Sequence, residues 1–320
     1  MSDILNSIWS AILRAGYYLE GSYTHRVLVT TIDLLGQLWY FFVAGIVISA
    51  AISLIWSRES VAAFFQRSSR VSIIGAAFVG IVSPMPMYAA IPLVAALFRI
   101  GVPIHVLFAF LVASPLINPV LFFITAGAFG YEMALARTAA ALVLGVAAGW
   151  VAFVLIAHDK LGTFLNGGSA GPFTISTGRQ RQSLATCAAD FGHEVYHLGR
   201  WATKYFLLGI FAAALAKNLI PVGWIAKSFG GNQTLSVLTA VAAGVPLYAC
   251  GGGTIPVMKT LQDLGLDKGA VLAFFISGPA TKLSTIVALN AAVTRRVFFL
   301  YLAITLIGAT VFGLLYNLWQ

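Results

Sequence analysis

The sequence predicts an all-α polytopic membrane protein built from two tandem homologous halves. Its 320 residues are 60% hydrophobic and 9% charged, with a mean hydropathy of +0.92, whereas a soluble domain carries roughly 25% charged residues. Apolar stretches long enough to span a bilayer recur, for example at 38–56, 139–157 and 297–318. Because these stretches are apolar throughout and do not alternate, they predict membrane helices and not a closed barrel.

A pattern of proline, glycine and aromatic residues occurs twice at one constant spacing. The first copy reads Ile91-Pro92, Leu97, Gly101, Ala109-Phe110 and Ser114-Pro115, and the second reads Ile255-Pro256, Leu261, Gly265, Ala273-Phe274 and Gly278-Pro279. Each residue of the first copy lies 164 positions before its counterpart, and the same offset pairs Phe42 with Phe206. Duplicated apolar segments that proline interrupts indicate the binding site of a secondary transporter.

The offset also predicts the organisation of the chain. We expect an amphipathic segment at 1–26, half one at 27–157, a polar linker at 158–192 and half two at 193–320. Each half holds four apolar segments, the second and third of which are broken by proline or glycine. The expected segments are 27–57, 71–99, 104–127 and 131–157, then 198–220, 234–262, 266–290 and 296–318.

The membrane topology of the two halves has two solutions. Four crossings per half would make the halves parallel. Re-entrant hairpins at 71–99 and 234–262 would leave three crossings per half and make the halves inverted repeats. The inverted arrangement places more of the loop Lys and Arg on one side, as the positive-inside rule requires, so we favour it.

Charge and motif content narrow the functional classes. The net charge of +9 indicates loop topology and attraction to anionic lipid, and not nucleic-acid binding. The two cysteines, Cys187 and Cys250, are too few for a disulfide framework. The sequence contains no phosphate-binding loop for ATP and no cofactor motif. The expected partners are therefore a small solute or ion and the lipid bilayer, with homo-oligomerisation left open.

A glycine-rich break in half two is the first candidate site. Three consecutive glycines stand between Pro246 and Pro256 and disfavour a helix. Unwound backbone survives in a membrane only where protein or a water-filled cavity satisfies it, so these groups and the soft thiol of Cys250 could bind an ion or polar solute. The alternative is a seam for close helix packing. The expected substrate-binding residues here are Cys250, Gly251, Gly252, Gly253 and Thr254, with Met85 and Met87, beside Pro84, in half one.

A second pair of breaks places Asn118 in half one at the position of Lys282 in half two. A lysine within an apolar segment is costly, so it either binds an anion, takes part in proton coupling or extends to the interface. Asp33, which the offset pairs with His197, is a second candidate for coupling or an interfacial residue. The residues expected to break helices are Pro84, Pro92, Pro115, Pro119, Pro256, Gly278 and Pro279.

One motif points to a different class of function. The run from His193 to His197 matches H-E-x-x-H, which on a helix places two histidines on one face and Glu194 as the general base of a zinc protease. A catalytic zinc needs a third protein ligand, and no histidine or carboxylate follows at a familiar distance. An intramembrane zinc metalloprotease, with His193 and His197 as metal ligands, is thus the alternative to a transporter, while a regulatory metal site or a chance cluster of polar residues at the membrane interface also fits the motif.

The paired motifs resemble those of a family of predicted bacterial permeases that includes the organoarsenical efflux permeases. The resemblance rests on Gly253-Thr254-Ile255-Pro256 and 277–281 in half two, and on Ile91-Pro92 and 113–119 in half one. It implies a multi-pass permease of the bacterial inner membrane that exports a small solute with the proton gradient, and no enzymatic activity. For an arsenical substrate it implies a cysteine thiolate, which Cys250 would supply.

The sequence departs from this family at two places. The family commonly has cysteine in the half-one stretch that here contains Met85 and Met87, and asparagine where Lys282 stands. We therefore expect a permease that works by alternating access on a soft metalloid or a small anion, with Lys282 as an anion-binding or coupling group.

Overall fold

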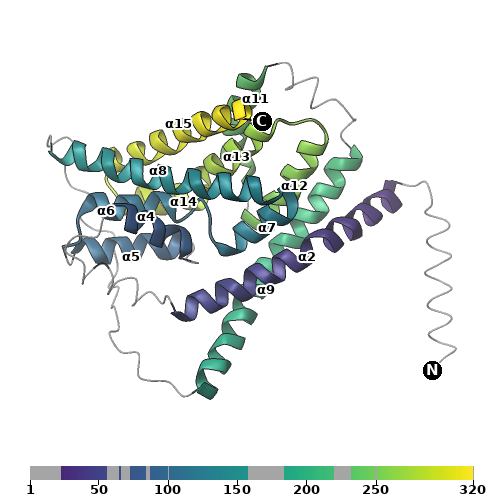
Figure 1. The fold of residues 1–320 in the computed structure, drawn as a ribbon, viewed down its shortest axis with the longest axis horizontal. Coiled ribbons are helices and arrows are strands. Elements are labelled where there is room, and N and C mark those ends of the chain that lie inside the picture. The colour runs from purple at the N-terminus through teal and green to yellow at the C-terminus, as the bar shows by residue number, and fades with distance from the viewer. Residues whose placement is uncertain are drawn as a thin grey trace.

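The fold is a bundle of α-helices, several of which are much shorter than a membrane is thick. The structure is a computed structural model and describes residues 23–55, 65, 73–83, 87–99, 101–157, 184–219, 232–248 and 251–319. Every regular element in these ranges is an α-helix, as Figure 1 shows. The helices are α2 (Tyr23–Ile55), α4 (Ile73–Val82), α5 (Met87–Arg99), α6 (Ile104–Ala113), α7 (Pro119–Phe129), α8 (Tyr131–Ala157), α9 (Leu184–Leu219), α11 (Gln233–Leu247), α12 (Gly251–Asp263), α13 (Lys268–Thr281), α14 (Leu283–Ala292) and α15 (Arg295–Trp319).

Three of these helices are long and apolar enough to cross a membrane, and they lie in Tyr23–Ala51, Tyr131–Ala157 and Arg295–Trp319. Helices α13 and α14 are apolar enough together to form a fourth span if they are counted as one segment, which bends by 48° at the break between them. The chain is thus a multi-pass helical membrane protein. Residues 1–22 of the expected amphipathic segment 1–26 and residues 158–183 of the expected linker 158–192 lie outside the described residues, and α9 begins inside that linker.

The helix boundaries recur at the spacing of the sequence motifs. Helices α5 and α12 begin and end 164 positions apart, and α6, α7 and α8 begin 164 positions before α13, α14 and α15. The turns that precede α6 and α13 have the same geometry, with Gly101 and Gly265 at positive φ. Each is a Schellman turn, since Gly101 and Val102 donate to the carbonyls of Phe98 and Leu97. Gly265 and Leu266 donate to Gln262 and Leu261 in the same way.

Packing inside the two parts of the chain also recurs. In the first part of the chain, up to residue 157, α4, α6 and α8 pack together. In the second part, from residue 184 onwards, α11, α13 and α15 pack together in the same way. Glycines at matching positions allow the close approach. A methyl group added at Gly149 would meet Ile73, His105 and Ala109, and one added at Gly313 would meet Val237, Gly269 and Ala273, each 164 positions further along.

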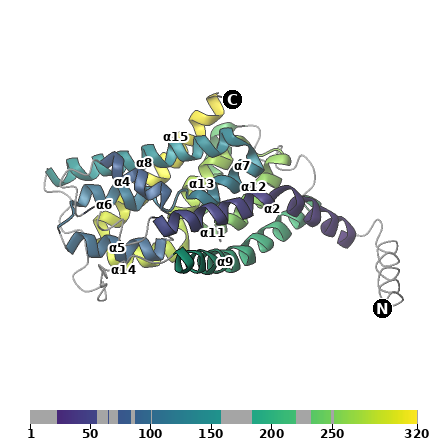
Figure 2. The same cartoon turned by 60° about the horizontal axis from the view of Figure 1, so that its bottom comes forward.

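Two antiparallel helix pairs join these parts. Phe42 of α2 stacks on Phe206 of α9, with ring centroids 4.2 Å apart and planes 5° apart. Further along the pair, the amide of Asn218 near the end of α9 donates to Thr30 near the start of α2 over 3.2 Å. Figure 2 shows α2 and α9 running side by side. The two phenylalanines are 164 positions apart, so each part contributes the same residue to one contact.

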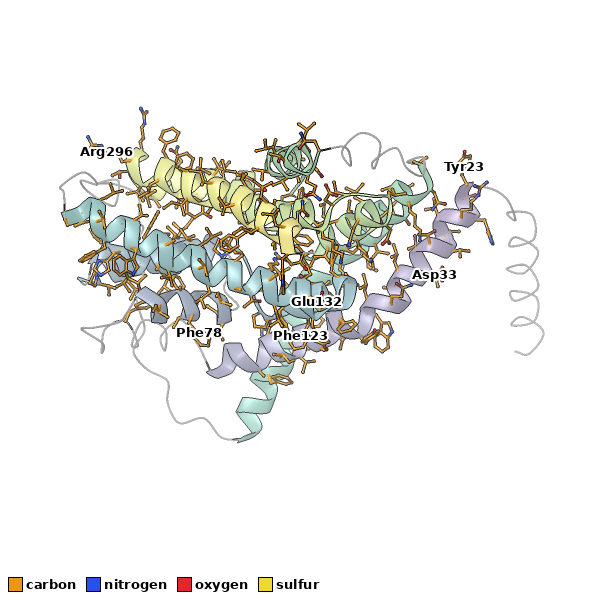
Figure 3. All side chains as sticks on the ribbon, turned by 45° about the horizontal axis from the view of Figure 1, so that its top comes forward. Tyr23, Asp33, Phe78, Phe123, Glu132 and Arg296 are labelled. Atoms are coloured by element: carbon orange, nitrogen blue, oxygen red, sulfur yellow. The ribbon has the colours of Figure 1, made fainter. Side chains whose placement is uncertain are left out.

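The second antiparallel pair is α8 with α15. The side chain of Leu144 in α8 fills the space in front of Gly308 in α15, again 164 positions apart. Glu132 and Arg296 occupy the same position near the starts of the two helices, yet they lie at opposite ends of the pair in Figure 3. Equivalent residues therefore face one another at the middle of both pairs, as in a two-fold symmetric contact.

Several expected helix breaks lie elsewhere. Helices α5 and α12 continue through Pro92 and Pro256, and α13 continues through Gly278 and Pro279 to end at Thr281. Gly251, Gly252 and Gly253 were expected to be unwound but form the first turn of α12. The first N–H groups of a helix have no partner within it, so glycine's weak propensity costs less there than in a helix interior. Pro115 does lie in the turn after α6, and Pro119 begins α7.

Candidate functional site

A buried arginine lies where the broken segments of the chain meet. Arg137 belongs to the second turn of α8, and only 1% of its surface is exposed. It is the largest of the fully buried side chains in the described residues. An arginine inside a membrane-spanning helix is costly and marks a functional site, because water cannot solvate its charge.

Half of the guanidinium is held by groups of the first part of the chain. Its Nε donates to the carbonyl oxygen of Leu116 over 3.1 Å, in the break between α6 and α7. Its Nη1 donates to Oγ1 of Thr125 in α7 over 3.0 Å. Thr125 donates its own hydrogen to the carbonyl of Leu121 over 2.6 Å. The hydroxyl therefore presents only lone pairs to the arginine, which fixes the direction of this hydrogen bond.

The second part of the chain contributes two aromatic rings. The guanidinium carbon lies 4.6 Å from the ring centroid of Phe275 in α13, a cation–π distance. Phe129 of α7 packs edge-on against the same ring at 5.5 Å. The phenol of Tyr248, which ends α11, lies beside the guanidinium. Arg137 thus contacts a helix break in each part of the chain. We call Arg137, Leu116, Thr125, Tyr248 and Phe275 the arginine site.

The charge of this site is not balanced by a carboxylate in the described residues. The described residues do contain an ion pair, between Lys259 and Asp263 at 2.9 Å, but it is partly exposed on α12 and does not include Arg137. Nη2 of Arg137 is buried and makes no hydrogen bond of ordinary length within the described part of the chain, although the phenol of Tyr248 lies near the guanidinium. Removing a guanidinium from water costs on the order of several kcal/mol unless an opposite charge or hydrogen bonds compensate for the lost solvation. Among the described residues, the positive charge of the arginine site is therefore surrounded by neutral partners alone.

Asn118 and Lys282 occupy the same structural position, as the sequence predicted. Each is the N-cap residue of the helix after a break, Asn118 for α7 and Lys282 for α14. Oδ1 of Asn118 accepts from the N–H of Leu121 over 2.9 Å, so this oxygen already caps a helix. Lys282 is half-buried, and its side chain makes no capping hydrogen bond. The lysine is thus the less engaged of the two side chains.

The glycine run lies at a tight helix crossing. A methyl group added at Gly209 of α9 would overlap the backbone of Gly253, so α9 and α12 approach at backbone distance. Thr254 is buried beside it. This geometry is the close packing that the sequence left open as an alternative to a binding role, and it holds the start of α12 in place.

Other expected site residues are only partly described. Pro84, Met85 and Cys250 lie outside the described residues, and for Met87 and Pro92 the backbone alone is described. Asp33 is exposed on α2, towards the Tyr23 end in Figure 3. The structure does not bring Asp33 into the arginine site.

The H-E-x-x-H motif lies on α9, as expected for a helix. His193 is exposed, while the side chains of Glu194 and His197 lie outside the described residues. Among the side chains that are described, no group of three or more His, Cys, Asp or Glu could hold a metal ion.

Sequence reasoning missed Arg137. The candidate residues were selected at the proline and glycine breaks, and Arg137 does not lie at one. The signal that could have revealed it is a single cation at the seventh residue of the apolar segment 131–157. The residue 164 positions later is a tyrosine, Tyr301.

Apolar spanning helices, broken helices between them and a buried cation at the breaks together define a polytopic membrane protein of the transporter type. The chain belongs to the family of predicted permeases named ArsP_1, whose family model matches residues 24–318. The family confirms the resemblance found in the sequence.

Two curated relatives are similar along most of the chain. The protein named "UPF0718 protein YcgR" from Bacillus subtilis (strain 168) is 24% identical over 267 residues, which cover 83% of this chain and 88% of that protein. The "Putative two-component membrane permease complex subunit" of Streptococcus mutans is 23% identical over 259 residues, covering 79% and 82%. No solved structure matches the chain.

Proposed function

We propose that this protein moves a small solute across the bacterial inner membrane by alternating access between two inverted halves. One observation carries the proposal, which is that broken segments of the two halves meet reciprocally. Helix α7 of half one packs on α12 of half two, and α5 of half one packs on α14 of half two. These are the same contact seen from each half, because α5 corresponds to α12 and α7 to α14. Such a meeting of broken helices is where secondary transporters bind substrate.

The antiparallel pairs support the inverted arrangement. A two-fold axis that relates antiparallel helices is perpendicular to them, so it lies in the membrane plane when the helices span the membrane. The pairs α2 with α9 and α8 with α15 both have this relation. Inverted halves can exchange conformations, which opens a central site first to one side and then to the other.

The proposed path includes the residues that the sequence selected. In this proposal the substrate-binding residues are Cys250, Gly251, Gly252, Gly253 and Thr254 from half two, where the packing of Gly253 on α9 positions the start of α12, and Met85 and Met87 from half one. Asn118 and Lys282 stand at equivalent caps beside the path, and Lys282 and Asp33 are the candidates for proton coupling. Trivalent arsenic seeks sulfur, so Cys250 suits a soft metalloid, while the cations suit a small anion.

Accumulation of a trivalent organoarsenical in a sensitive bacterial strain tests this function. We expect less arsenic in cells with the wild-type protein than in cells with an empty vector, and loss of that difference in Cys250→Ser. Cys187→Ser is the matched control and should behave as the wild type. Equal accumulation with verified, membrane-inserted protein would remove arsenicals as substrates. Stoichiometric zinc in the purified protein, lost in His193→Ala, would instead support the protease.

A further inference from the structure

We infer that the arginine site is the anion-binding group of this permease and that the solute it takes is a small oxyanion. The inference rests on the proposed transport function and names the substrate class. It assigns the central charge to Arg137, and not to Lys282, which the sequence favoured. The binding edge is the part of the guanidinium that the protein leaves unused.

The hydrogen bonds of Arg137 determine what that edge offers. A guanidinium has five N–H donors. Leu116 and Thr125 engage two of them, and the phenol of Tyr248 lies close enough to interact with a third. Nη2 is buried and makes no hydrogen bond of ordinary length within the described residues. Adjacent N–H groups on the two terminal nitrogens match the two oxygens of a carboxylate, phosphate or sulfate, which favours an oxyanion over a spherical halide.

The surroundings leave the positive charge largely uncompensated. The carbonyl of Leu116 comes just after the C-terminal end of α6, whose partial negative charge favours the cation. Arg137 itself lies near the N-terminal end of α8, whose partial positive charge opposes it. Phe275 and Tyr248 supply a π-face and a neutral phenol, which are weaker partners than a carboxylate. An incoming anion would complete the neutralisation.

The position between the two halves suits a transported ligand. Leu116 and Thr125 hold Arg137 within half one, whereas Phe275 and Tyr248 belong to half two. Rocking of one half against the other would separate the guanidinium from Phe275 while its hydrogen bonds within half one remain. The arginine would therefore stay in place while the free edge is exposed.

Thermal unfolding of the purified full-length protein in detergent tests the assignment. Sodium phosphate and sodium sulfate are titrated against sodium chloride and sodium gluconate at equal ionic strength. A ligand that binds the folded state raises the unfolding midpoint, and near saturation we expect phosphate or sulfate to raise it by about 3 °C or more. The shift should disappear in Arg137→Met, which keeps the volume of the side chain, and be reduced in Arg137→Lys, which keeps charge but not the fork.

Lys259→Met is the matched control. It removes the same charge from a partly exposed site and should keep the full shift. The inference is overturned if no oxyanion stabilises the wild type, or if Arg137→Met keeps the shift. If Arg137→Met does not fold, the contrast between Arg137→Lys and the wild type decides in the same way.

Uptake of labelled phosphate or sulfate by proteoliposomes separates this inference from the transport function. A wild-type protein that is stabilised by an oxyanion but carries none across the bilayer would retain the binding site and refute the transport function. A wild-type protein that exports the arsenical but shows no oxyanion shift would retain transport and refute the anion site.

Discussion

Arg137 in α8 and Tyr301 in α15 occupy the same position of the two halves, and the difference between them is instructive. Both side chains are essentially inaccessible to solvent, and both carry a polar atom without a hydrogen-bond partner in the described residues. Yet one is a permanent cation and the other a neutral phenol at ordinary pH. The helix boundaries recur in the two parts of the chain, whereas in the proposed site the charged side chain comes from the first part alone.

The packing of the long helices shows the same asymmetry. Helix α2 packs on α7 through Gly45, whereas its counterpart α9 packs on α12 through Gly209, although the two glycines are 164 positions apart. These two helices therefore pack on partners that are not equivalent, although the packing of α4, α6 and α8 recurs in α11, α13 and α15. In the alternating access that we propose, two inverted halves in different conformations would produce this difference, since each half would adopt in turn the conformation of its partner.

The largest expected effect comes from truncating Arg137 and, in a separate variant, Tyr301. We predict that Arg137→Ala lowers the uptake of the bound oxyanion at least about 100-fold, because the loss of charge-assisted hydrogen bonds of about 3 kcal/mol changes binding by that factor. Tyr301→Phe should stay within about twofold of wild type, since it removes a buried hydroxyl that has no partner in the described residues. Proteoliposome uptake measures both. Equal losses in the two variants would show that the halves share the site.

The next effect concerns the helix crossings. Gly209→Ala should destabilise the protein by about 1–3 kcal/mol, because the new methyl group overlaps the backbone of Gly253. Gly45→Ala should cost less, since its methyl group would meet Val120 at 3.0–3.2 Å. Gly36→Ala, with nothing within 4 Å, should be neutral or stabilising. Unfolding midpoints in detergent give this ranking. A stable Gly209→Ala would mean that α9 and α12 do not cross here.

A smaller effect tests how Arg137 is oriented. Thr125→Val removes the acceptor of Nη1 and should cost about 1–3 kcal/mol, because a buried donor loses its partner. Thr125→Ser keeps the hydroxyl and should cost less. Thermal unfolding measures the stability, and oxyanion affinity should fall in the valine variant only. Equal stability of the valine and serine variants would argue against this hydrogen bond.

The smallest effect separates the two equivalent caps. Asn118→Ala should lose about 1 kcal/mol of stability with the N-cap, and Asn118→Asp should retain most of it. Lys282→Ala removes no capping hydrogen bond, so its effect should appear in transport and in the dependence of transport on pH. Unchanged transport and pH dependence in Lys282→Ala would remove the coupling role of Lys282.

The sequence predicted the helical membrane class and the family, because long apolar segments and the paired motifs can be recognised without knowledge of the fold. It misplaced the breaks at Pro92 and Pro256. Each proline removes a single ladder hydrogen bond, which a helix inside a protein-lined membrane region can tolerate. Whether a glycine starts a helix or interrupts one depends on tertiary contacts such as that of Gly209 with Gly253, which no local pattern encodes.

The site was predicted less well than the fold. Asn118 and Lys282 were paired by the constant offset of 164 positions, and the prolines beside them drew attention to both. Arg137 lies in a regular helix without any break, and its partners Leu116 and Phe275 are distant in sequence. A buried charge is recognised through the groups that surround it, and these come together only in the folded chain.

The orientation of the equivalent turns before α6 and α13 tests the central claim most directly. Pro103→Cys, in the turn before α6, and Lys268→Cys, at the first residue of α13, are each made in a variant with Cys187 and Cys250 replaced by serine, and both positions are exposed. A membrane-impermeant maleimide is then applied to right-side-out and inside-out vesicles. Inverted halves predict that the two thiols react from opposite sides of the membrane. Reaction of both thiols from the same side would contradict the inverted arrangement, and with it the proposed exchange of conformations between the halves.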